Sequence, residues 1–506
     1  MRSFLLLLAV LLAACPPPRR PPPAEAPEEE AREERRGTVR THLGPILGDL
    51  QAASVVLWAR AERAATLHAQ IWRRGTDADH LRQLAQEAID ASDRTAQVRF
   101  DGLVPATTYH YRAWFGGPEE RTAPDDAAEG LFRTAPRPSE SAPLRFAFGG
   151  DLAGQNVCRD REEGFPIFEP LARRRQAFFL GLGDMIYGDG RCDEVGRYGN
   201  AQVAAPFVES ARIEDFWAHW RYAREDLALQ KFLERTPYVA VWDDHEVAND
   251  FGPDDPLAPI GLRAFLHHNP VDAGASAGRR LHRALRYGKN VELLVLDTRQ
   301  HRDSATLPDL DDAPKTLLGR EQRAWLEGRL RESDARWLVV ASSVPIGIPT
   351  GSEQARDGWA DGGNGQGYER ELGALFEVAR ENRRNLLFLT TDVHFATVLR
   401  YTPFPDDPAF VVHEVVVGPL NAGIYPREDL DETFAPERLF FHQPGDPTAI
   451  STWEEAKAWF TFGEIDVDWD GYLRLRVLGV DGGVLFEKSL RPPQAGRSEA
   501  PDTTEG

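Results

Sequence analysis

The fold of this chain is decided by one stretch, Val239-Ala-Val-Trp-Asp-Asp-His-Glu-Val-Ala-Asn249. Its apolar part, from Tyr238 to Trp242, is typical of a buried strand because it is short and rich in β-branched and aromatic residues. Four ionisable residues follow in succession, and burying an unpaired charge costs several kcal/mol. Carboxylates beside an imidazole are most often paired with a metal cation. The alternative is a solvated turn in which Asp243 or Asp244 caps a helix.

The same arrangement recurs after three other short apolar runs. Each run has the length of a buried strand, and an Asp follows it within a few residues. In α/β sheets, ligands bind beyond the carboxyl ends of the strands, so these acidic residues are expected to meet at that edge. The runs are 144–148, followed by Asp151; 178–182, followed by Asp184 and Tyr187; and 385–389, followed by Asp392 and His394.

Both ends of the chain are expected to lie outside the folded part. Residues 1–14 are typical of a signal peptide, because Arg2 precedes an apolar run too short to span a bilayer. The segment Leu12-Ala-Ala-Cys15 resembles the lipobox of bacterial lipoproteins, in which lipid is attached to the Cys. An ordinary secretory peptide cut elsewhere is the alternative. Residues 15–37, rich in Pro, Glu and Arg, predict a disordered tether, and residues 491–506 predict a disordered tail.

The composition is strongly acidic, with 80 Asp and Glu residues against 59 Lys and Arg residues and a formal net charge of −21. Such a surface repels phosphate backbones, which argues against a nucleic-acid-binding protein. Small phosphate esters are not excluded, because a local metal charge can attract them. The length predicts two or three domains with a sizeable core.

Residues 38–137 predict a separate all-β domain resembling a fibronectin or immunoglobulin-like sandwich. The segments 54–60, 66–72 and 108–115 alternate between apolar and polar residues as half-buried strands do. Leu103-Val-Pro-Ala-Thr-Thr-Tyr109 resembles the start of a strand in fibronectin type III-like sandwiches, whose aromatic residue packs at a corner. The segment shows no cluster of ionisable residues, so we expect a packing or spacer module.

Residues 143–490 predict a layered α/β domain, because apolar strands alternate with amphipathic helices. Helices are expected at 165–175, 213–234, 319–331 and 368–383, and further strands at 291–297, 337–341, 411–417, 459–465 and 472–480. No internal repeat is present in the sequence.

These motifs resemble the PhoD-like alkaline phosphatases and phosphodiesterases, which are calcineurin-like metallophosphoesterases and are similar to purple acid phosphatases. The resemblance rests on Gly183-Asp-x-x-Tyr187, on the block from Asp243 to Glu246 and on Asp392-x-His394. Three accessory stretches agree with it, at 296–302, 318–325 and 341–345. It covers residues 143–490 and implies a layered α/β/β/α metallophosphoesterase sandwich preceded by the small β-sandwich.

The resemblance implies two or more metal ions. Ions in a two-metal site lie about 3.5–4 Å apart, so one carboxylate must bridge them. Asp184 is the candidate bridge, because Gly183 allows a tight turn beneath it. A phenolate ligand points to Fe(III) and an oxygen-rich second site to Ca²⁺, with Mg²⁺, Mn²⁺ and Zn²⁺ as alternatives. The first site would also comprise Asp151, Tyr187 and His394, and the second Asp244, Asp392 and, as a further candidate, Asn249.

The implied reaction is hydrolysis of a phosphate ester by in-line attack of a metal-bound hydroxide. His245 is the candidate for stabilising or protonating the leaving oxygen. Arg299 is a candidate clamp for a phosphate oxygen, with a structural ion pair as the alternative. Two positions depart from the family pattern, which usually has Cys at or near Asp151 and Gly at Thr391. The first departure makes its metal site harder, and the second stiffens the turn before Asp392.

Two cysteines remain, Cys158 and Cys192, once Cys15 is assigned to lipid. They lie in loops after two strands that we place side by side, and such a pair oxidises readily in an exported protein. We therefore predict a disulfide between them. Zinc ligation is the alternative, although the sequence has no Cys-x-x-Cys spacing.

Together these observations predict an exported, membrane-anchored, metal-dependent phosphoesterase of the bacterial cell envelope that acts on phosphomonoesters, phosphodiesters or both. Two alternatives keep the fold: a catalytically silent surface lipoprotein, and a ligand-binding module led by the sandwich. The expected partners are a phosphate-ester substrate and, through lipid on Cys15, a membrane. No obligate protein partner is evident from the sequence.

Overall fold

The computed structural model describes residues 39–75, 81–205, 207, 209–272, 280–425 and 429–492. These residues belong to one compact unit that begins at Val39. The predicted signal peptide, the predicted lipidation site Cys15, the tether and residues 493–506 of the predicted tail lie outside the described residues. Within the described part, no helix combines the length and the apolar character needed to cross a membrane.

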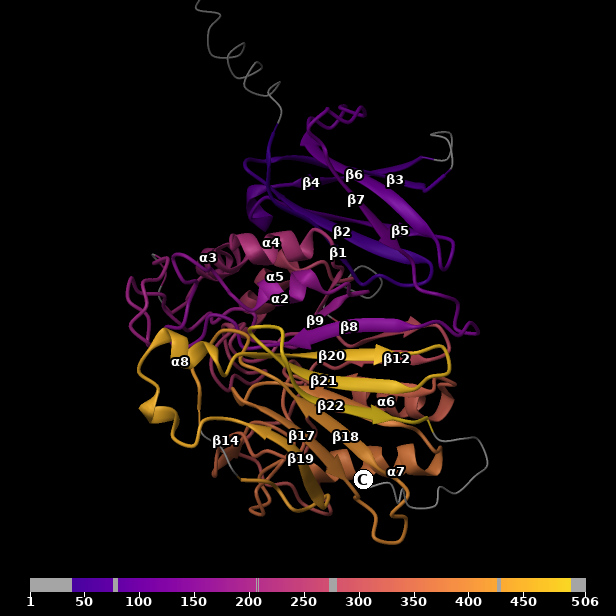
Figure 1. Ribbon diagram of the computed structural model, residues 1–506, viewed down its shortest axis with the longest axis vertical. Coiled ribbons are helices and arrows are strands. Elements are labelled where there is room, and N and C mark those ends of the chain that lie inside the picture. The colour runs from indigo at the N-terminus through magenta and orange to yellow at the C-terminus, as the bar shows by residue number, and fades with distance from the viewer. Residues whose placement is uncertain are drawn as a thin grey trace, which may run out of the picture. The chain divides into compact units, whose positions relative to one another are not determined.

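Two large β-sheets form the centre of the fold (Figure 1). The first has the strand order β22 (Val484–Leu490), β21 (Leu473–Gly479), β20 (Thr461–Val467), β8 (Leu144–Gly149), β9 (Phe179–Gly181), β10 (Tyr238–Ala240), β1 (Thr41–Gly48), β2 (Ser54–Ala61) and β5 (Thr95–Asp101). The second has the order β11 (Arg283–Tyr287), β12 (Val291–Val295), β13 (Trp337–Ala341), β16 (Leu386–Thr390), β18 (Val412–Val416), β17 (Ala396–Tyr401) and β19 (Pro436–His442). Neighbours β8, β9 and β10 are parallel, as are β12, β13, β16 and β18.

Alternating side chains along the strands place a hydrophobic core on each face of these sheets. In β8, Phe146 and Phe148 pack between the two sheets, whereas Ala147 packs outside the first sheet. In β12, Leu293 faces the core between the sheets and Leu294 faces the outside of the second. Helices supply the remainder of both outer cores. The result is the four-layered α/β/β/α sandwich that the sequence predicts, so the predicted fold class is confirmed.

The outer layers are built from helices of different chain segments (Figure 1). Outside the first sheet lie α2 (Phe168–Arg173), α3 (Ile213–Arg224), α4 (Leu227–Leu233), α5 (Ala258–His268) and the short α8 (Trp453–Lys457). Outside the second sheet lie α6 (Gly319–Glu332) and α7 (Glu369–Glu381). A small hairpin, β14 (Gly351–Ser352) with β15 (Ala355–Arg356), completes this region.

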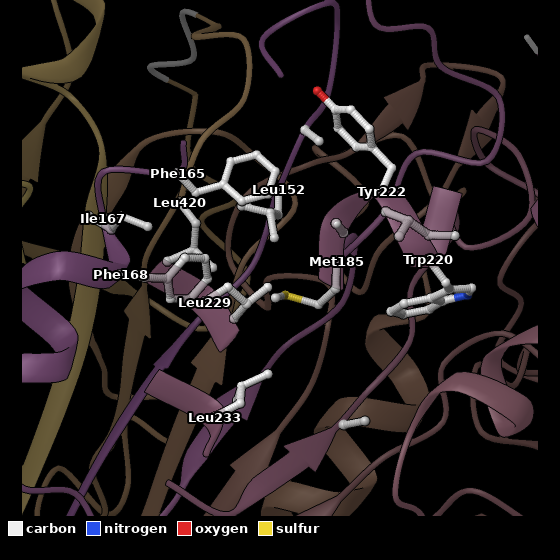
Figure 2. Close-up of a cluster of buried hydrophobic side chains, with 14 of the residues drawn as sticks. Leu152, Phe165, Ile167, Phe168, Met185, Trp220, Tyr222, Leu229, Leu233 and Leu420 are labelled. Carbon is white, nitrogen blue, oxygen red and sulfur yellow. The ribbon is translucent and has the colours of Figure 1, made fainter. Parts of the chain in front are cut away.

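The core outside the first sheet anchors two of the loops that carry predicted ligands. Leu152 directly follows Asp151, Met185 directly follows Asp184, and both apolar side chains are almost fully buried. Figure 2 shows Leu152 and Met185 within one cluster of aromatic and leucine side chains. Because protein interiors are close packed, these two residues limit how far the preceding carboxylates can move.

The N-terminal strands form a β-sandwich with a core of their own. Its outer sheet has the order β4 (Arg82–Ala88), β3 (Ala65–Arg73), β6 (Thr108–Gly116) and β7 (Ala128–Arg133), and it packs on strands β1, β2 and β5. Tyr109 is buried near the start of β6, where its hydroxyl accepts a hydrogen bond from the amide of Val104 at 2.9 Å. The structure thus has a corner aromatic residue at the position where the sequence predicts one.

This sandwich shares a sheet with the rest of the fold. Strand β1 extends the first sheet beyond β10 through a parallel pairing of Gly48 with Tyr238. A buried polar cluster centred on Asp93 lies between the same parts of the chain. The Asp93 carboxylate accepts hydrogen bonds from three residues, Arg60 at 3.0 Å, Arg221 at 2.7 Å and His268 at 3.1 Å. Residues 38–137, expected as a separate domain, are therefore tied to the α/β part by backbone pairing and by charge.

Two sequence expectations differ from the structure. The helix expected at 213–234 is two helices, α3 and α4, because Asp226 interrupts the run and caps α4 by accepting a hydrogen bond from the amide of Leu229 at 2.8 Å. The four strands that precede the acidic motifs do not share one sheet. Strands β8, β9 and β10 lie in the first sheet and β16 in the second, so their loops meet across the sandwich.

Candidate metal centre

The loops after β8, β9, β10 and β16 bring their acidic and imidazole side chains together. Three groups of ligand atoms each lie within 4.8 Å of one another, namely Asp151–Asp184–His394, Asp184–Asp244–His245 and Asp243–Asp244–Asp392. Asp184 and Asp244 each belong to two of the groups, so the three sets are contiguous. Such an arrangement can hold two cations that share a carboxylate. Asp243, which the sequence analysis did not assign as a ligand, is part of it.

Four of the predicted ligands hold left-handed backbone conformations. The φ angles are 61° at Asp151, 51° at Asp184, 78° at Asp392 and 59° at His394. Such values are uncommon for residues with a Cβ, cost of order 1–3 kcal/mol each and concentrate at functional sites. Gly183, expected to allow a tight turn, has a φ of 119°. A Cβ at that position would lie 2.6 Å from the Cβ of Asp243, so the close approach of the two loops requires glycine.

Burial and mutual repulsion raise the pKa of the carboxyl groups at the centre. Burial, together with the charge of Asp243, raises the pKa of Asp151 to about 7. Burial and the charge of Asp244 raise the pKa of Asp184 well above its ordinary value. Burial and the charge of Asp243 do the same to the pKa of Asp392. Carboxylates packed this closely are stable in the ionised form only beside cations.

Three carboxylate oxygens at the centre are buried and have no hydrogen-bond partner in the described part of the chain. They are the Oδ2 atoms of Asp184, Asp243 and Asp392. A buried acceptor left without a donor costs about 1–3 kcal/mol, so such atoms are rare in folded proteins. Metal ions satisfy oxygens of this kind. The donor set therefore fits the metal ions that the sequence implies.

Tyr187 lies beside His394, as the sequence motifs predict. Its hydroxyl is 2.9 Å from Nε2 of His394, and its ring centroid is 4.1 Å from that of His245. The other ring nitrogen of His394 donates to the carbonyl oxygen of Gly423, so the lone pair of the ring is on Nε2, where it faces the Tyr187 hydroxyl and can bind a metal. Burial and the charge of Asp184 raise the pKa of the Tyr187 phenol well above its ordinary value. The phenol therefore ionises near neutral pH only beside a strongly Lewis-acidic cation.

His245 is held by a carboxylate that the sequence analysis did not single out. Nδ1 of His245 donates to Oδ1 of Asp189 at 2.7 Å, and Oδ2 of Asp189 accepts from the amide of Asn249 at 2.9 Å. Burial opposes protonation of His245, but the charge of Asp244 and the bond to Asp189 outweigh it and raise the pKa of His245 to about 9. The contact with Asp189 involves Nδ1 and leaves Nε2 free of that carboxylate.

Glu246 connects two of the ligand loops. Its buried carboxylate accepts hydrogen bonds from the amides of Asp184 at 3.1 Å, Met185 at 2.8 Å and Asp243 at 2.7 Å. Both oxygens are occupied in this way, so Glu246 positions the loops that carry ligands. Two of these amides lie 62 and 61 residues away in the sequence, and the third is at the start of the turn that contains Glu246. The sequence shows that Glu246 is ionisable but does not show these partners.

Two predicted site residues, Arg299 and Asn249, lie outside the three groups of ligand atoms. Arg299 is fully buried, its guanidinium lies 2.6 Å from Asp243, and two of its N–H groups donate to Asp357 at 2.8 and 2.7 Å. These contacts are those of the structural ion pair, the alternative that the sequence left open beside the phosphate clamp. Asn249 is exposed and contacts the centre through its backbone amide, which donates to Asp189.

A disulfide joins Cys158 and Cys192, whose Cα atoms are 5.7 Å apart. The two cysteines follow β8 and β9, which are parallel neighbours in the first sheet. The bond connects the loop that begins at Asp151 with the loop that carries Asp184 and Tyr187. It therefore restrains two ligand-bearing segments relative to each other.

Comparisons with known proteins agree with this geometry. The PhoD-like phosphatase family model matches residues 146–470, which include all four loops of the centre. The chain belongs to the PhoD-like phosphatase family. The model of the N-terminal domain of PhoD-like phosphatases matches residues 25–136, over the β-sandwich.

Known phosphatases are similar to this chain in sequence and in fold. Alkaline phosphatase D of Bacillus subtilis (strain 168) is 27% identical over 396 residues, which are 70% of this chain and 64% of that protein. This chain thus spans slightly less than two thirds of that relative. A solved structure of PhoD has a TM-score of 0.67 at 22% identity, covering 91% of this chain and 92% of the other. The structure of the purple acid phosphatase PPD1 of yellow lupin (Lupinus luteus) has a TM-score of 0.56 at 13% identity, and the match covers 88% of this chain and 73% of the other.

The two departures from the pattern of PhoD-like phosphatases contact each other. Thr391 Oγ1 donates a hydrogen bond to Oδ2 of Asp151 at 2.8 Å, and the amide of Asp392 is 3.3 Å from Oδ1 of Asp151. An Asp in place of Cys adds an oxygen that needs a donor, and the Thr hydroxyl supplies one. The Thr391 hydroxyl thus satisfies one oxygen of Asp151, which is the candidate ligand from this loop.

Proposed function

We propose that this chain is a metal-dependent phosphoesterase that hydrolyses phosphate esters at the centre described above. The observation that carries the proposal is the position of Asp184, which belongs to two groups of ligand atoms at once. A carboxylate shared in this way suits a pair of cations, and such pairs stabilise the attacking and leaving oxygens of phosphoryl transfer. The unpartnered buried oxygens of Asp184, Asp243 and Asp392 support the same interpretation.

The bound cations would polarise the phosphate and increase the acidity of the attacking water. His245 supplies the general acid, because the Asp189 carboxylate that accepts from Nδ1 favours the protonated ring and makes no contact with Nε2. Asp189 holds the imidazole through Nδ1, and the ring of Tyr187 packs against it. With its orientation fixed in this way, His245 can donate a proton to the leaving oxygen as the ester bond breaks.

We propose Fe(III) at the group Asp151–Asp184–His394 with Tyr187, and Ca²⁺ at the oxygen-rich group that includes Asp244 and Asp392. The position of the Tyr187 hydroxyl, 2.9 Å from Nε2 of His394, supports a strongly Lewis-acidic ion at the first position, because a phenol ionises near neutral pH only beside such an ion. Carboxylate oxygens support a hard ion at the second, where Mg²⁺, Mn²⁺ and Zn²⁺ are the alternatives. Elemental analysis and a visible phenolate-to-iron band that Tyr187→Phe removes test this assignment. A colourless, iron-free and fully active preparation overturns it.

The activity is tested by assaying the purified, metal-loaded protein on a phosphomonoester, a phosphodiester and a phospholipid. We expect hydrolysis of at least one ester, no turnover by Asp184→Asn, and normal turnover by Asp431→Asn. Asp431 belongs to a second acidic group, with Asp361 and Glu369, and is therefore a matched control. A folded protein that binds no metal in elemental analysis would instead be a catalytically silent surface lipoprotein. A protein that binds metal stoichiometrically but hydrolyses none of the three esters overturns the proposed activity.

We further propose that the protein is exported and anchored to a bacterial membrane through lipid on Cys15. The support is the segment Leu12-Ala-Ala-Cys15 together with the disulfide, since disulfides form and persist in oxidising compartments. Mass spectrometry of the protein from membranes should show an acylated N-terminus at Cys15. Cys15→Ala should release the protein from the membrane, and a wild-type protein with an unmodified N-terminus elsewhere contradicts the proposal.

A further inference from the structure

Arg197 lies on the loop that the disulfide ties to the centre. Its amide donates to the carbonyl oxygen of Asn156 at 2.9 Å, and Asn156 follows Asp151 on the neighbouring loop. The hydroxyl of Tyr198 accepts a hydrogen bond from the amide of Ile424 at 3.1 Å. Three chain segments therefore fix the backbone at Arg197, although its side chain is exposed.

Tyr425 connects the guanidinium of Arg197 to the metal centre. The ring of Tyr425 packs edge-on against the predicted ligand His394, with 5.2 Å between centroids. The Cζ atom of Arg197 is 5.3 Å from the Tyr425 centroid, and Nη1 donates to its hydroxyl at 3.4 Å. Tyr425 is 37% exposed. A cation and a partly exposed aromatic ring thus lie side by side, one contact outside the ligand shell.

The guanidinium of Arg197 has no carboxylate within ion-pair distance in the described part of the chain. Arg191, on the same loop, differs because it pairs with Asp193 at 3.1 Å. The chain has 80 acidic residues against 59 Lys and Arg residues, so most arginines can be expected to have a carboxylate partner, and Arg197 has none among the described residues. Arg197 therefore retains planar N–H donors that can bind an anion.

We propose that Arg197, held against Tyr425, is a subsite for a second anionic group on the organic part of the substrate. The inference rests on the proposed function, because it assumes that the scissile phosphate occupies the cations. Two successive ring contacts of 5.2 and 5.3 Å separate His394 from the guanidinium, so Arg197 serves a group some atoms away from that phosphate. The favoured substrate class is a phosphate ester whose organic group carries another phosphate.

Two esters that differ only in this group test the subsite, the monophosphate and the bisphosphate of propane-1,3-diol. Arg197→Ala should lower kcat/KM for the bisphosphate by about 10- to 100-fold, the value of a charge-assisted hydrogen bond. The loss should appear in KM, and kcat/KM for the monophosphate should stay unchanged. Arg197→Lys should recover part of the loss, because it keeps the charge and loses the fork of donors. Arg191→Ala is the matched control and should leave both esters unchanged.

An equal loss for the two esters, or no loss for either, overturns the subsite. If the wild-type protein hydrolyses neither ester, the subsite is judged by binding, and the proposed function is judged separately on a phosphodiester and a phospholipid. In that case, equilibrium titration with the bisphosphate should give an affinity at least 10-fold weaker in Arg197→Ala than in the wild type. An unchanged affinity overturns the subsite independently of the activity.

Discussion

Several residues at the metal centre hold unfavourable backbone conformations that direct their side chains toward one another. Asp151, Asp184, Asp392 and His394 all hold positive φ angles, and the loops beneath them are fixed by Glu246 and by the buried Leu152 and Met185. Strain of this kind persists only when surrounding contacts determine the conformation. Binding of cations to the four side chains would offset it. The metal centre is therefore expected to contribute to stability as well as to catalysis.

Asp184→Asn tests this at a single residue. The amide keeps the size of the side chain but removes the charge that two ligand groups share. We expect turnover to disappear and bound metal to fall, while circular dichroism shows a folded protein. The thermal midpoint of the metal-loaded wild type should exceed that of the variant, and in chelator the difference should disappear or reverse, because the charge of Asp184 is then only repelled by its neighbours. Full activity and stoichiometric metal in the variant would show that the assignment is wrong.

His245 and Asp189 should behave as one unit. His245→Ala should spare metal binding and slow hydrolysis by roughly 10²–10⁴, with the greatest effect on poor leaving groups. In the wild type, the Asp189 carboxylate orients Nδ1 of His245 and helps to raise the pKa of that ring. Asp189→Asn removes this carboxylate, so it should slow hydrolysis of the same substrates. The double variant should be no slower than His245→Ala alone. Losses that are independent of the leaving group, or that multiply, contradict a leaving-group role.

At the scale of the element, loops rather than strands carry the functional contacts. The strands 144–148, 178–182, 238–242 and 385–389 are predictable from sequence because a continuous apolar run ending in polar residues describes a strand buried on both faces. Strands with mixed exposure escape this reasoning. Strand β19 is half-buried along its length and β22 is largely exposed, and neither was predicted.

The same distinction explains which site residues were found. Four candidate ligands directly follow strands that can be recognised in the sequence, so their positions can be predicted. They are Asp151, Asp184, Asp392 and His394. The role of Asp189 depends on His245, which is 56 residues away, and no local pattern reports that contact. Arg299 was open to two interpretations because burial, which separates an enclosed ion pair from a substrate clamp, is a property of the folded chain.

The disulfide between Cys158 and Cys192 should matter more for rate than for folding. It restrains the loops after β8 and β9, and a misplacement of about 1 Å in a catalytic site can cost about 10² in rate. We expect mild reduction to lower activity before the near-ultraviolet circular dichroism changes. Cys158→Ser with Cys192→Ser should reproduce the low activity and become insensitive to reductant. Free thiols at both positions in a fully active wild-type protein would refute the restraint.

At the scale of the whole molecule, the Asp93 cluster links the β-sandwich to α3 and α5. Arg60 comes from the sandwich, whereas Arg221 and His268 come from the two helices. Burial opposes ionisation of Asp93, but hydrogen bonds from His268 and Arg60 outweigh it and hold the pKa of Asp93 well below its usual range. Burial lowers the pKa of His268 to about 4 although Asp93 opposes this shift.

These two shifts predict a loss of stability on acidification in two steps. The unfolded chain takes up a proton at His268 below about pH 6.5 and the folded chain does not, so stability falls from there to about pH 4. The contribution of Asp93 is complete above its unfolded pKa near 4 and is lost below it. His268→Gln should reduce the fall in unfolding free energy between pH 7 and pH 5 by about 2 kcal/mol.

Denaturant unfolding of the metal-free protein at the two pH values measures this difference and keeps metal release out of the comparison. His110→Gln, on the partly exposed face of the sandwich, is the control and should show the wild-type dependence. An unchanged pH dependence in His268→Gln would mean that other groups determine the acid sensitivity.

The pairing of β1 with β10 also bears on self-association. Strand β10, which leads into Asp243 and Glu246, lies between β9 and β1, so β1 is the neighbour that keeps it from being an edge strand. An open edge presents unpaired backbone groups to other chains and promotes aggregation. A molecule whose sandwich is cut away or not yet folded would expose this edge directly beside its metal ligands. The sandwich therefore covers this edge through β1. The strand that it covers, β10, is also the strand that leads into the metal centre.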